Sequence, residues 1–358
     1  MSQGTVERLV AIDHHKLNLR LAMYAIVGGL IAVAVEAVVG VGALQVGIAA
    51  VLVAMVGREG TLRTRLVHMG GITLVGGAFG FLSYVTAETA WQAALVLAVI
   101  SYVTGLAYGR GPAEGRAGYL VLLWAMAVLI GESRAEDPPV TAAAFLLGGV
   151  VAMVVVAVVF EIERRRGRDA PIPADVESLA ESTSPTPEFG ALVRSDIGIY
   201  CLVRAILVGV AVLVGYWITT DGLDPYWVSI VVLIVFLPDL HQTLFKGTQR
   251  GIGTLVGAMV ATVILELTGS DALVVVLMLV GAFGAVAFYS ANYMIYAFFL
   301  TNAVLMYYWF DTDEALSGPP TRLLATIIGL ALAFGGMGLM TLRSLRTSPP
   351  GVDNRSDH

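Results

Sequence analysis

Basic residues stand at matching places in two polar segments that separate apolar runs. Arg65 and Lys246 are 181 residues apart (246 − 65), with Arg63 beside the first and Arg250 beside the second. A guanidinium binds a carboxylate through two parallel hydrogen bonds, and an ammonium attracts it as a point charge. The spacing predicts a paired basic surface that collects organic anions. Cations are also common in the cytoplasmic segments of membrane proteins, so the placement is more informative than the number.

Two further charges interrupt apolar runs, which is costly by about 2.5–3.5 kcal/mol at the centre of a membrane. Arg204 lies about two turns into the run 197–218, where it could hold a carboxylate or simply satisfy the rule that cations favour the cytoplasmic side. Glu36 interrupts the run 19–39 and could take and release a proton. The alternative for Glu36 is a carboxylate close enough to the interface to reach water.

Amide and aromatic side chains share one predicted helix face in the run 292–310. Asn292, Tyr296 and Asn302 recur there with Phe299 and Met306 at steps of three and four residues. This face is a credible lining for the path of a flat aromatic acid. The alternative is that the polar groups bond to neighbouring helices.

The sequence contains none of the usual patterns of enzyme or metal sites. There is no HExxH, no phosphate-binding loop and no CxxC, and the single Cys201 excludes a cysteine-based metal cluster. We therefore expect no enzymatic activity, no cofactor and no metal. The net charge of −6 argues against nucleic acid as a partner.

The composition indicates the elements that must position these residues. Of 358 residues, 57 % are hydrophobic and only 13 % are charged, with a mean hydropathy of +0.82. Such a chain is typical of an all-α integral membrane protein, whose main partner is the lipid bilayer. About twelve apolar runs follow one another, near 19–39, 41–57, 66–86, 90–109, 113–131, 140–160, 197–218, 225–237, 250–268, 271–290, 292–310 and 321–342.

The run 225–237 is too short to cross a membrane alone, because a helix needs roughly 20 residues to do so. Pro225 is suited to the first turn of this helix, and Pro238 ends the run. Tyr226 and Trp227 then fall at one membrane interface, where amphipathic rings are common. From this place they are also candidates for the substrate path.

The chain is predicted to be a tandem duplication. Thr254-Leu255-Val256-Gly257-Ala258 repeats Thr73-Leu74-Val75-Gly76-Gly77 at an offset of 181 residues (254 − 73). Pro138-Pro139 recur as Pro319-Pro320 at the same offset. Six runs in each half, an even number, give two repeats of the same orientation, parallel and not inverted.

Arginine and lysine place both termini in the cytoplasm, because the long loops of the opposite face are acidic. The predicted organisation is a cytoplasmic segment 1–18, a first six-helix repeat 19–163, a polar linker 164–192, a second six-helix repeat 193–346 and a disordered tail 347–358. No soluble domain fits between the repeats. The expected location is the plasma or inner membrane, crossed many times.

Three motifs follow one another in the second half of the chain. They are Asp224-Pro225-Tyr226-Trp227, the apolar run that ends at Leu237-Pro238, and Lys246-Gly247-Thr248-Gln249-Arg250-Gly251 leading into Gly253-Thr254-Leu255-Val256-Gly257. In identity and spacing they resemble the aromatic acid exporter and fusaric acid resistance family of membrane proteins. The first half resembles it less, with Gln45-Val46 in place of Tyr226-Trp227.

The resemblance implies export of organic acids, often aromatic carboxylates, driven by an ion gradient. A periplasmic adaptor assists some such exporters, but the lack of a large domain between the halves argues against one here. We therefore predict a proton-coupled exporter of a small organic anion, with Glu36 as the coupling carboxylate. The alternatives are a passive organic-anion channel and a scaffold without transport. Homo-oligomers are common in this architecture, although no interface can be identified from the sequence.

Overall fold

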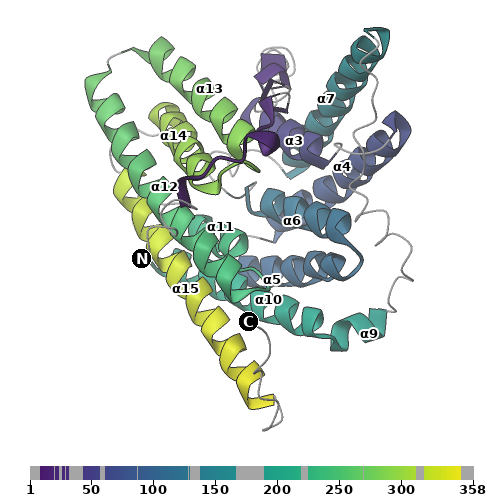
Figure 1. Cartoon of the computed structure of the whole chain (residues 1–358), viewed down its shortest axis with the longest axis vertical. Helices are drawn as coiled ribbons and strands as arrows, with labels where there is room; N and C mark the ends of the chain where they lie inside the picture. Colours follow the sequence, from purple (N-terminus) through teal and green to yellow (C-terminus); the bar gives the residue numbers. More distant parts are fainter. Residues whose placement is uncertain are drawn as a thin grey trace, which may run out of the picture.

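The structure is a computed structural model of the chain, and every regular element in the part that it describes is helical. It describes residues 9–19, 21–23, 26–28, 30–31, 43–56, 61–86, 88–127, 129, 138–166, 189–218, 225–268, 270–311 and 318–347. Figure 1 shows α12 and α15 along one flank, α4 and α7 along the other, and α11 between them.

The helices of the first half are α3 (Ala43–Val56), α4 (Leu62–Val85), α5 (Ala90–Leu106), α6 (Pro112–Ala127) and α7 (Pro138–Arg165). The short α9 (Phe189–Arg194) precedes the second half. The second half contains α10 (Asp196–Ile218), α11 (Tyr226–Val235), α12 (Leu240–Leu267), α13 (Asp271–Phe288), α14 (Tyr293–Asp311) and α15 (Gly318–Thr347).

Helix starts recur at the predicted offset. α5 and α13 begin 181 residues apart (271 − 90), and so do α6 and α14 (293 − 112). The packing recurs as well, because α4 contacts both α6 and α7 while α12 contacts both α14 and α15. The two halves therefore place their helices in the same order and at nearly the same spacing.

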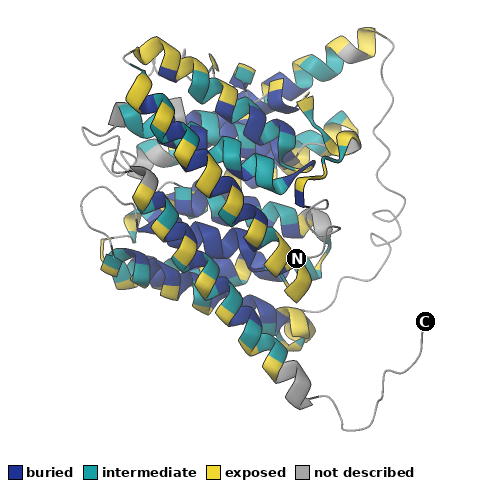
Figure 2. Ribbon diagram, turned by 60° about the vertical axis from the view of Figure 1, so that its left-hand side comes forward, coloured by how far each residue is buried: buried dark blue, intermediate teal, exposed yellow. Residues whose placement is uncertain are grey.

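Seven helices of the described residues are long and apolar enough to cross a membrane: those of 62–85, 90–109, 142–162, 196–218, 240–267, 271–288 and 320–342. α3 and α11 are shorter, and the first predicted span lies mostly outside the described residues. Large apolar side chains also cover the outside, as with Trp217 at 86 % and Leu267 at 82 % exposure. Exposed stretches alternate with buried ones along the outer helices, as Figure 2 shows. The chain is thus a multi-pass membrane protein, while the total of twelve spans and their orientation stay predictions.

The short helix α11 forms the centre of the second half. All ten of its residues are buried, and α10, α15, α6 and α12 pack around it. A 10-residue apolar helix suits this position, because apolar runs of such length are more often core helices than spans. Pro225 is its N-cap, one position before the expected first turn. Tyr226 and Trp227 are buried as well, so their rings pack inside the protein, and their predicted place at the depth of a membrane interface stays a prediction.

Each half extends one segment into the other. α10 of the second half packs along α5 of the first half. The two helices approach closely at Gly209, where an added Cβ would lie 3.3 Å from the carbonyl oxygen of Ala94. In return, the N–H groups of Asp13 and Asn18 donate to the carbonyls of Ala291 (3.1 Å) and Ala287 (3.1 Å). The halves are therefore interlocked.

Helix direction defines two ends of the second half. The inner end is where α11 finishes and α12 begins, and the sequence predicts that it faces the cytoplasm. The outer end is where α11 and α15 begin, and there the Arg322 guanidinium meets the Trp227 ring.

Candidate anion-binding site

Every fully buried charged side chain in the described part of the chain is an arginine. These are Arg204, Arg250 and Arg322, which are 1 %, 1 % and 3 % exposed. A buried cation is costly unless it is paired or hydrogen-bonded. What each guanidinium contacts therefore separates a structural role from a binding role.

Arg250 and Lys246 lie on one face of α12 at the inner end. α12 begins at Leu240 because the Asp239 carboxylate caps it, accepting a hydrogen bond from the N–H of Gln242 (2.7 Å). The two cations are four residues apart and thus one turn apart on the same side. The prediction that they are loop residues is wrong, and Arg250 is buried while Lys246 is half-buried.

Tyrosines surround this pair. The Lys246 Nζ lies 5.1 Å from the centroid of the Tyr293 ring, at the start of α14. The Tyr293 and Tyr296 centroids are 5.2 Å apart, and those of Tyr289 and Tyr296 are 5.3 Å apart. The sequence predicted Tyr296 but not Tyr289 and Tyr293. The available signal was the spacing of three residues between Tyr293 and Tyr296, which brings them to one face of α14, whereas Tyr289 lies just after α13.

Several donors in this cluster lack acceptors. Arg250 Nε and Nη1, the Tyr293 hydroxyl and the Thr254 hydroxyl are all buried without a hydrogen-bond partner among the described residues. The Tyr293 hydroxyl lies near the Arg250 guanidinium, but not in hydrogen-bonding geometry. Buried donors of this kind are uncommon and costly. We call Lys246, Arg250, Thr254 and Tyr293 the inner cluster.

The first half contributes to the same region through Tyr119 of α6. Its hydroxyl is within electrostatic range of Tyr289, Tyr293 and Tyr296, as well as of Tyr108 at the end of α5. The inner cluster therefore faces the boundary between the halves. Tyr119 carried no sequence signal, because only the packing of α6 reveals it.

The first half does not reproduce the cation pair. Arg65 is half-buried on α4, and its guanidinium lies 5.7 Å from the centroid of the Phe160 ring of α7. At the offset of 181, the counterpart of Arg250 is Met69 (250 − 181), which is fully buried. Arg63 is exposed. The second half thus carries the inner cluster, while the position 181 residues before Arg250 holds an apolar side chain.

Arg204 joins the two halves. Its Nη2 donates to the carbonyl of Ser101 in α5 (2.6 Å), and its guanidinium lies 5.8 Å from the ring centroids of Tyr108 and of Tyr200. Gly105 provides the space, because a Cβ there would lie 2.6 Å from Nη2. These contacts favour a structural role for Arg204 over substrate binding.

The two asparagines of the predicted stripe use their amides within the protein. Asn292 accepts a hydrogen bond from the N–H of Ile295 (3.0 Å) and so caps α14. The Asn302 amide donates to the carbonyl of Phe298 (2.9 Å), on the side that faces Gly257 of α12. Phe299 instead packs on Gly284 of α13. The stripe therefore contacts two different helices, α12 and α13.

The N-terminal segment lies directly beside the inner cluster. The Asn292 amide donates to the carbonyls of Leu9 (3.1 Å) and Ala11 (2.9 Å), and the Gln249 amide donates to that of Leu9 (3.3 Å). Gln249 is the neighbour of Arg250. We call residues 9–18 the N-terminal strap, which the sequence analysis treated only as a polar segment.

The outer end holds a second cation among aromatic rings. The Arg322 Cζ lies 3.1 Å from the centroid of the Trp227 ring, whose Nε1 donates to the Tyr308 hydroxyl (2.9 Å). Close by in the chain, the Tyr226 and Tyr216 hydroxyls share a hydrogen bond of 2.7 Å. The sequence identified Tyr226 and Trp227 but not Arg322.

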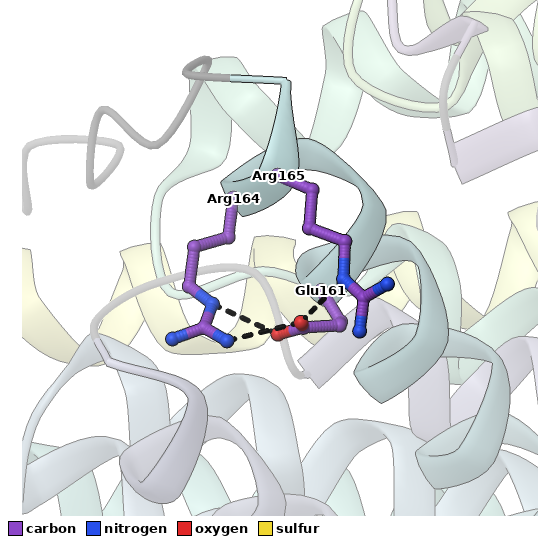
Figure 3. Close-up of polar contacts among 3 residues, drawn as sticks. All are labelled: Glu161, Arg164 and Arg165. Atoms are coloured by element: carbon purple, nitrogen blue, oxygen red, sulfur yellow. Dashed lines mark hydrogen bonds and ion pairs between the residues drawn. The ribbon is translucent and has the colours of Figure 1, made fainter.

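Exposed arginines at the end of α7 form ion pairs, unlike the cations of the inner cluster in the described part of the chain. At the end of α7, the Glu161 carboxylate accepts from Arg164 Nε (2.8 Å) and Nη2 (3.0 Å) and from Arg165 Nε (2.8 Å), as Figure 3 shows. Such surface pairs contribute little to stability. By contrast, no ion pair of Lys246 or Arg250 occurs among the residues that the structure describes.

Other predicted features bear on the site as follows. Glu36 lies outside the described residues. Within the described ranges, no group of His, Cys, Asp and Glu could hold a metal ion, and Cys201 is a buried free thiol. A groove of about 210 Å³ between α4 and α5 is lined only by apolar and aromatic side chains, including Phe79, Leu95 and Val99. That groove faces outward, away from the buried cations.

Fold and site together define a helical membrane protein with buried, positively charged side chains. Residues 206–335 match the model of the fusaric acid resistance protein-like family. This range includes all of α11 to α14, with the inner cluster and Arg322. This part of the second half is therefore similar to that family, in agreement with the resemblance of its motifs. A search of curated proteins and a search of solved structures each found no match.

Proposed function

We propose that this protein exports small organic acids, and that the inner cluster captures them as anions from the cytoplasm. The observation that carries the proposal is the buried Arg250, whose Nε and Nη1 lack acceptors while Lys246 lies one turn away. A carboxylate would supply acceptor oxygens and a negative charge. Charge-assisted hydrogen bonds of this kind are about twice as strong as neutral ones.

The surroundings favour a flat aromatic acid as substrate. Tyr289, Tyr293 and Tyr296 place ring faces and edges around the cations. Aromatic rings interact well with one another at centroid distances of about 4.5–7 Å. A benzoate-like anion would pair its carboxylate with Arg250 and pack its ring on the tyrosines.

We further propose that export is coupled to proton entry across the plasma or inner membrane. Glu36 is the proposed coupling group, because a carboxylate within an apolar run is costly when charged and therefore exchanges protons readily. Its protonation from outside would accompany release of the anion. The proposal involves no enzymatic step.

The test is uptake of radiolabelled benzoate into inside-out membrane vesicles from cells that express the full chain. An imposed inside-acid gradient should drive accumulation above equilibrium, and Glu36→Gln should abolish it. The double variant Lys246→Gln/Arg250→Gln should reduce uptake by at least about tenfold, which corresponds to about 1.4 kcal/mol of binding. Arg165→Gln, which changes an exposed cation at the end of α7, is the matched control and should leave uptake unchanged.

Two outcomes would favour the alternatives. Equilibration of benzoate without a gradient, insensitive to Glu36→Gln, would identify a passive anion channel that uses the same cations. No uptake across a broad panel of aromatic and aliphatic acids would leave a scaffold role.

A further inference from the structure

A second buried cation lies on the same helices as the inner cluster but at the other end of the membrane unit. α14 connects the two places, because Tyr293 at its start contacts Lys246 and Tyr308 near its end bonds to Trp227. These tyrosines are 15 residues apart (308 − 293), which is about 22 Å of helix at 1.5 Å per residue. The separation is most of the roughly 30 Å hydrocarbon thickness.

The Coulomb energy of a pair falls in inverse proportion to the distance, so an anion that moves along α14 away from Arg250 is held less strongly by it. The Tyr296 hydroxyl is within electrostatic range of both Arg250 and Arg322. In the described part of the second half, Arg322 is the buried cation nearest the outer end. It is therefore the next favourable position for an anion on its way out.

The local geometry suits recognition of a carboxylate. The Trp227 ring covers one face of the Arg322 guanidinium at 3.1 Å, and the bond from Trp227 Nε1 to the Tyr308 hydroxyl fixes that ring. A guanidinium presents its N–H donors in its own plane, so an acceptor binds at the edge and not at the stacked face. Stacking thus orients the fork for an incoming planar anion.

We propose that Arg322 and Trp227 form a second anion-binding station, the outer station, from which the organic acid is released. This proposal deepens the export function described above and rests on it. Arg322 is then a specificity-determining residue, because it requires a carboxylate at the point of release. Trp227 is its positioning residue.

The outer station can be tested by binding, independently of transport. The full-length protein is purified in detergent and titrated with benzoate, and the fluorescence of Trp227 is obtained as the difference between the wild type and Trp227→Phe. A saturable change in this difference signal is expected for the wild type. Arg322→Gln should weaken it by about tenfold or more, and Lys246→Gln should leave it within about twofold.

Further variants keep the result decisive. If Arg322→Gln does not yield folded protein, Arg322→Lys keeps the charge but loses the bidentate fork, and several-fold weaker binding is expected. The proposal is overturned if wild-type Trp227 does not respond, if the arginine variants respond as the wild type does, or if Lys246→Gln abolishes the response. A normal Trp227 response together with absent gradient-driven uptake would instead refute export while supporting the station.

Discussion

At the scale of single residues, burial alone does not assign a role to an arginine. Arg204 and Arg250 are equally buried, yet Arg204 donates to the Ser101 carbonyl and has one nitrogen, Nε, without an acceptor, while two nitrogens of Arg250 lack acceptors. A guanidinium that bridges two helices stabilises the fold. A buried guanidinium without acceptors carries a desolvation penalty, and a bound anion offsets that penalty.

This difference predicts opposite effects of replacing Arg250 on stability and on binding. Arg250→Met copies the first half, where Met69 fills the equivalent position. Replacing an uncompensated buried charge by an apolar side chain of similar size removes the cost of burying that charge, so the stability should not fall. We expect an unchanged or higher melting temperature in detergent, with benzoate binding weakened by about tenfold or more in calorimetry. A lower melting temperature with unchanged affinity would contradict the assignment.

For Arg204 the prediction is a loss of stability. Gly105→Ala would place a Cβ 2.6 Å from Arg204 Nη2 and 2.9 Å from Cys201 Sγ, so the guanidinium must leave the Ser101 carbonyl. Such overpacking typically costs about 1–3 kcal/mol. Because the clash requires the long side chain, Gly105→Ala/Arg204→Met should cost less than the sum of the single changes. Thermal unfolding of the four proteins measures this coupling, and strict additivity would count against it.

At the scale of elements, the N-terminal strap shows how a peripheral segment becomes part of the site. Its carbonyls at Leu9 and Ala11 satisfy the amide of Asn292, whose oxygen caps α14. Through Gln249 the same segment contacts the helix that carries Arg250. The strap therefore holds α12 and α14 in register at the inner end.

Loss of the Asn292 amide should release the strap. Asn292→Ala removes the cap, at a cost of about 0.5–2 kcal/mol, together with both bonds to the strap. Hydrogen–deuterium exchange of residues 9–18 should accelerate. Asn302→Ala is the matched control, since its amide donates to Phe298 of its own helix and the strap should stay protected. Equal exchange in both variants would show that other contacts hold the strap.

The positions of the helices were the part of the fold that the sequence predicted best. The run 271–290 became α13 (Asp271–Phe288), because polar residues flank a continuous apolar stretch. The sequence could not predict which neighbour each face meets. The polar segment around Lys246 and Arg250 predicted a loop. Their burial depends instead on contacts with α14 and the strap, which are distant in sequence. Likewise, Phe299 and Asn302 share a face by spacing but pack on different helices.

At the scale of the whole molecule, the packing of α10 on a helix of the first half joins the two halves into one unit. α10 follows the predicted linker, yet it packs along α5 of the first half, where Arg204 bonds to Ser101. Both candidate stations, by contrast, are built mainly from helices of the second half. The first half then supplies support, with Tyr119 as its contribution near the inner cluster.

A cross-link between the halves would test directly whether α10 packs on α5. A Cβ built at Gly209 lies 3.4 Å from the Ala98 Cβ, close to the separation of about 3.5–4.5 Å found in disulfides. In a Cys201→Ala background with a protease site inserted in the linker 164–192, Ala98→Cys/Gly209→Cys should form a disulfide on mild oxidation. After cleavage the halves should migrate together without reductant and apart with it. Each single-cysteine variant should separate under both conditions. Separation of the oxidised double variant would mean that α10 does not pack on α5 in the membrane, and the boundary that Tyr119 and the inner cluster share would then have to be redrawn.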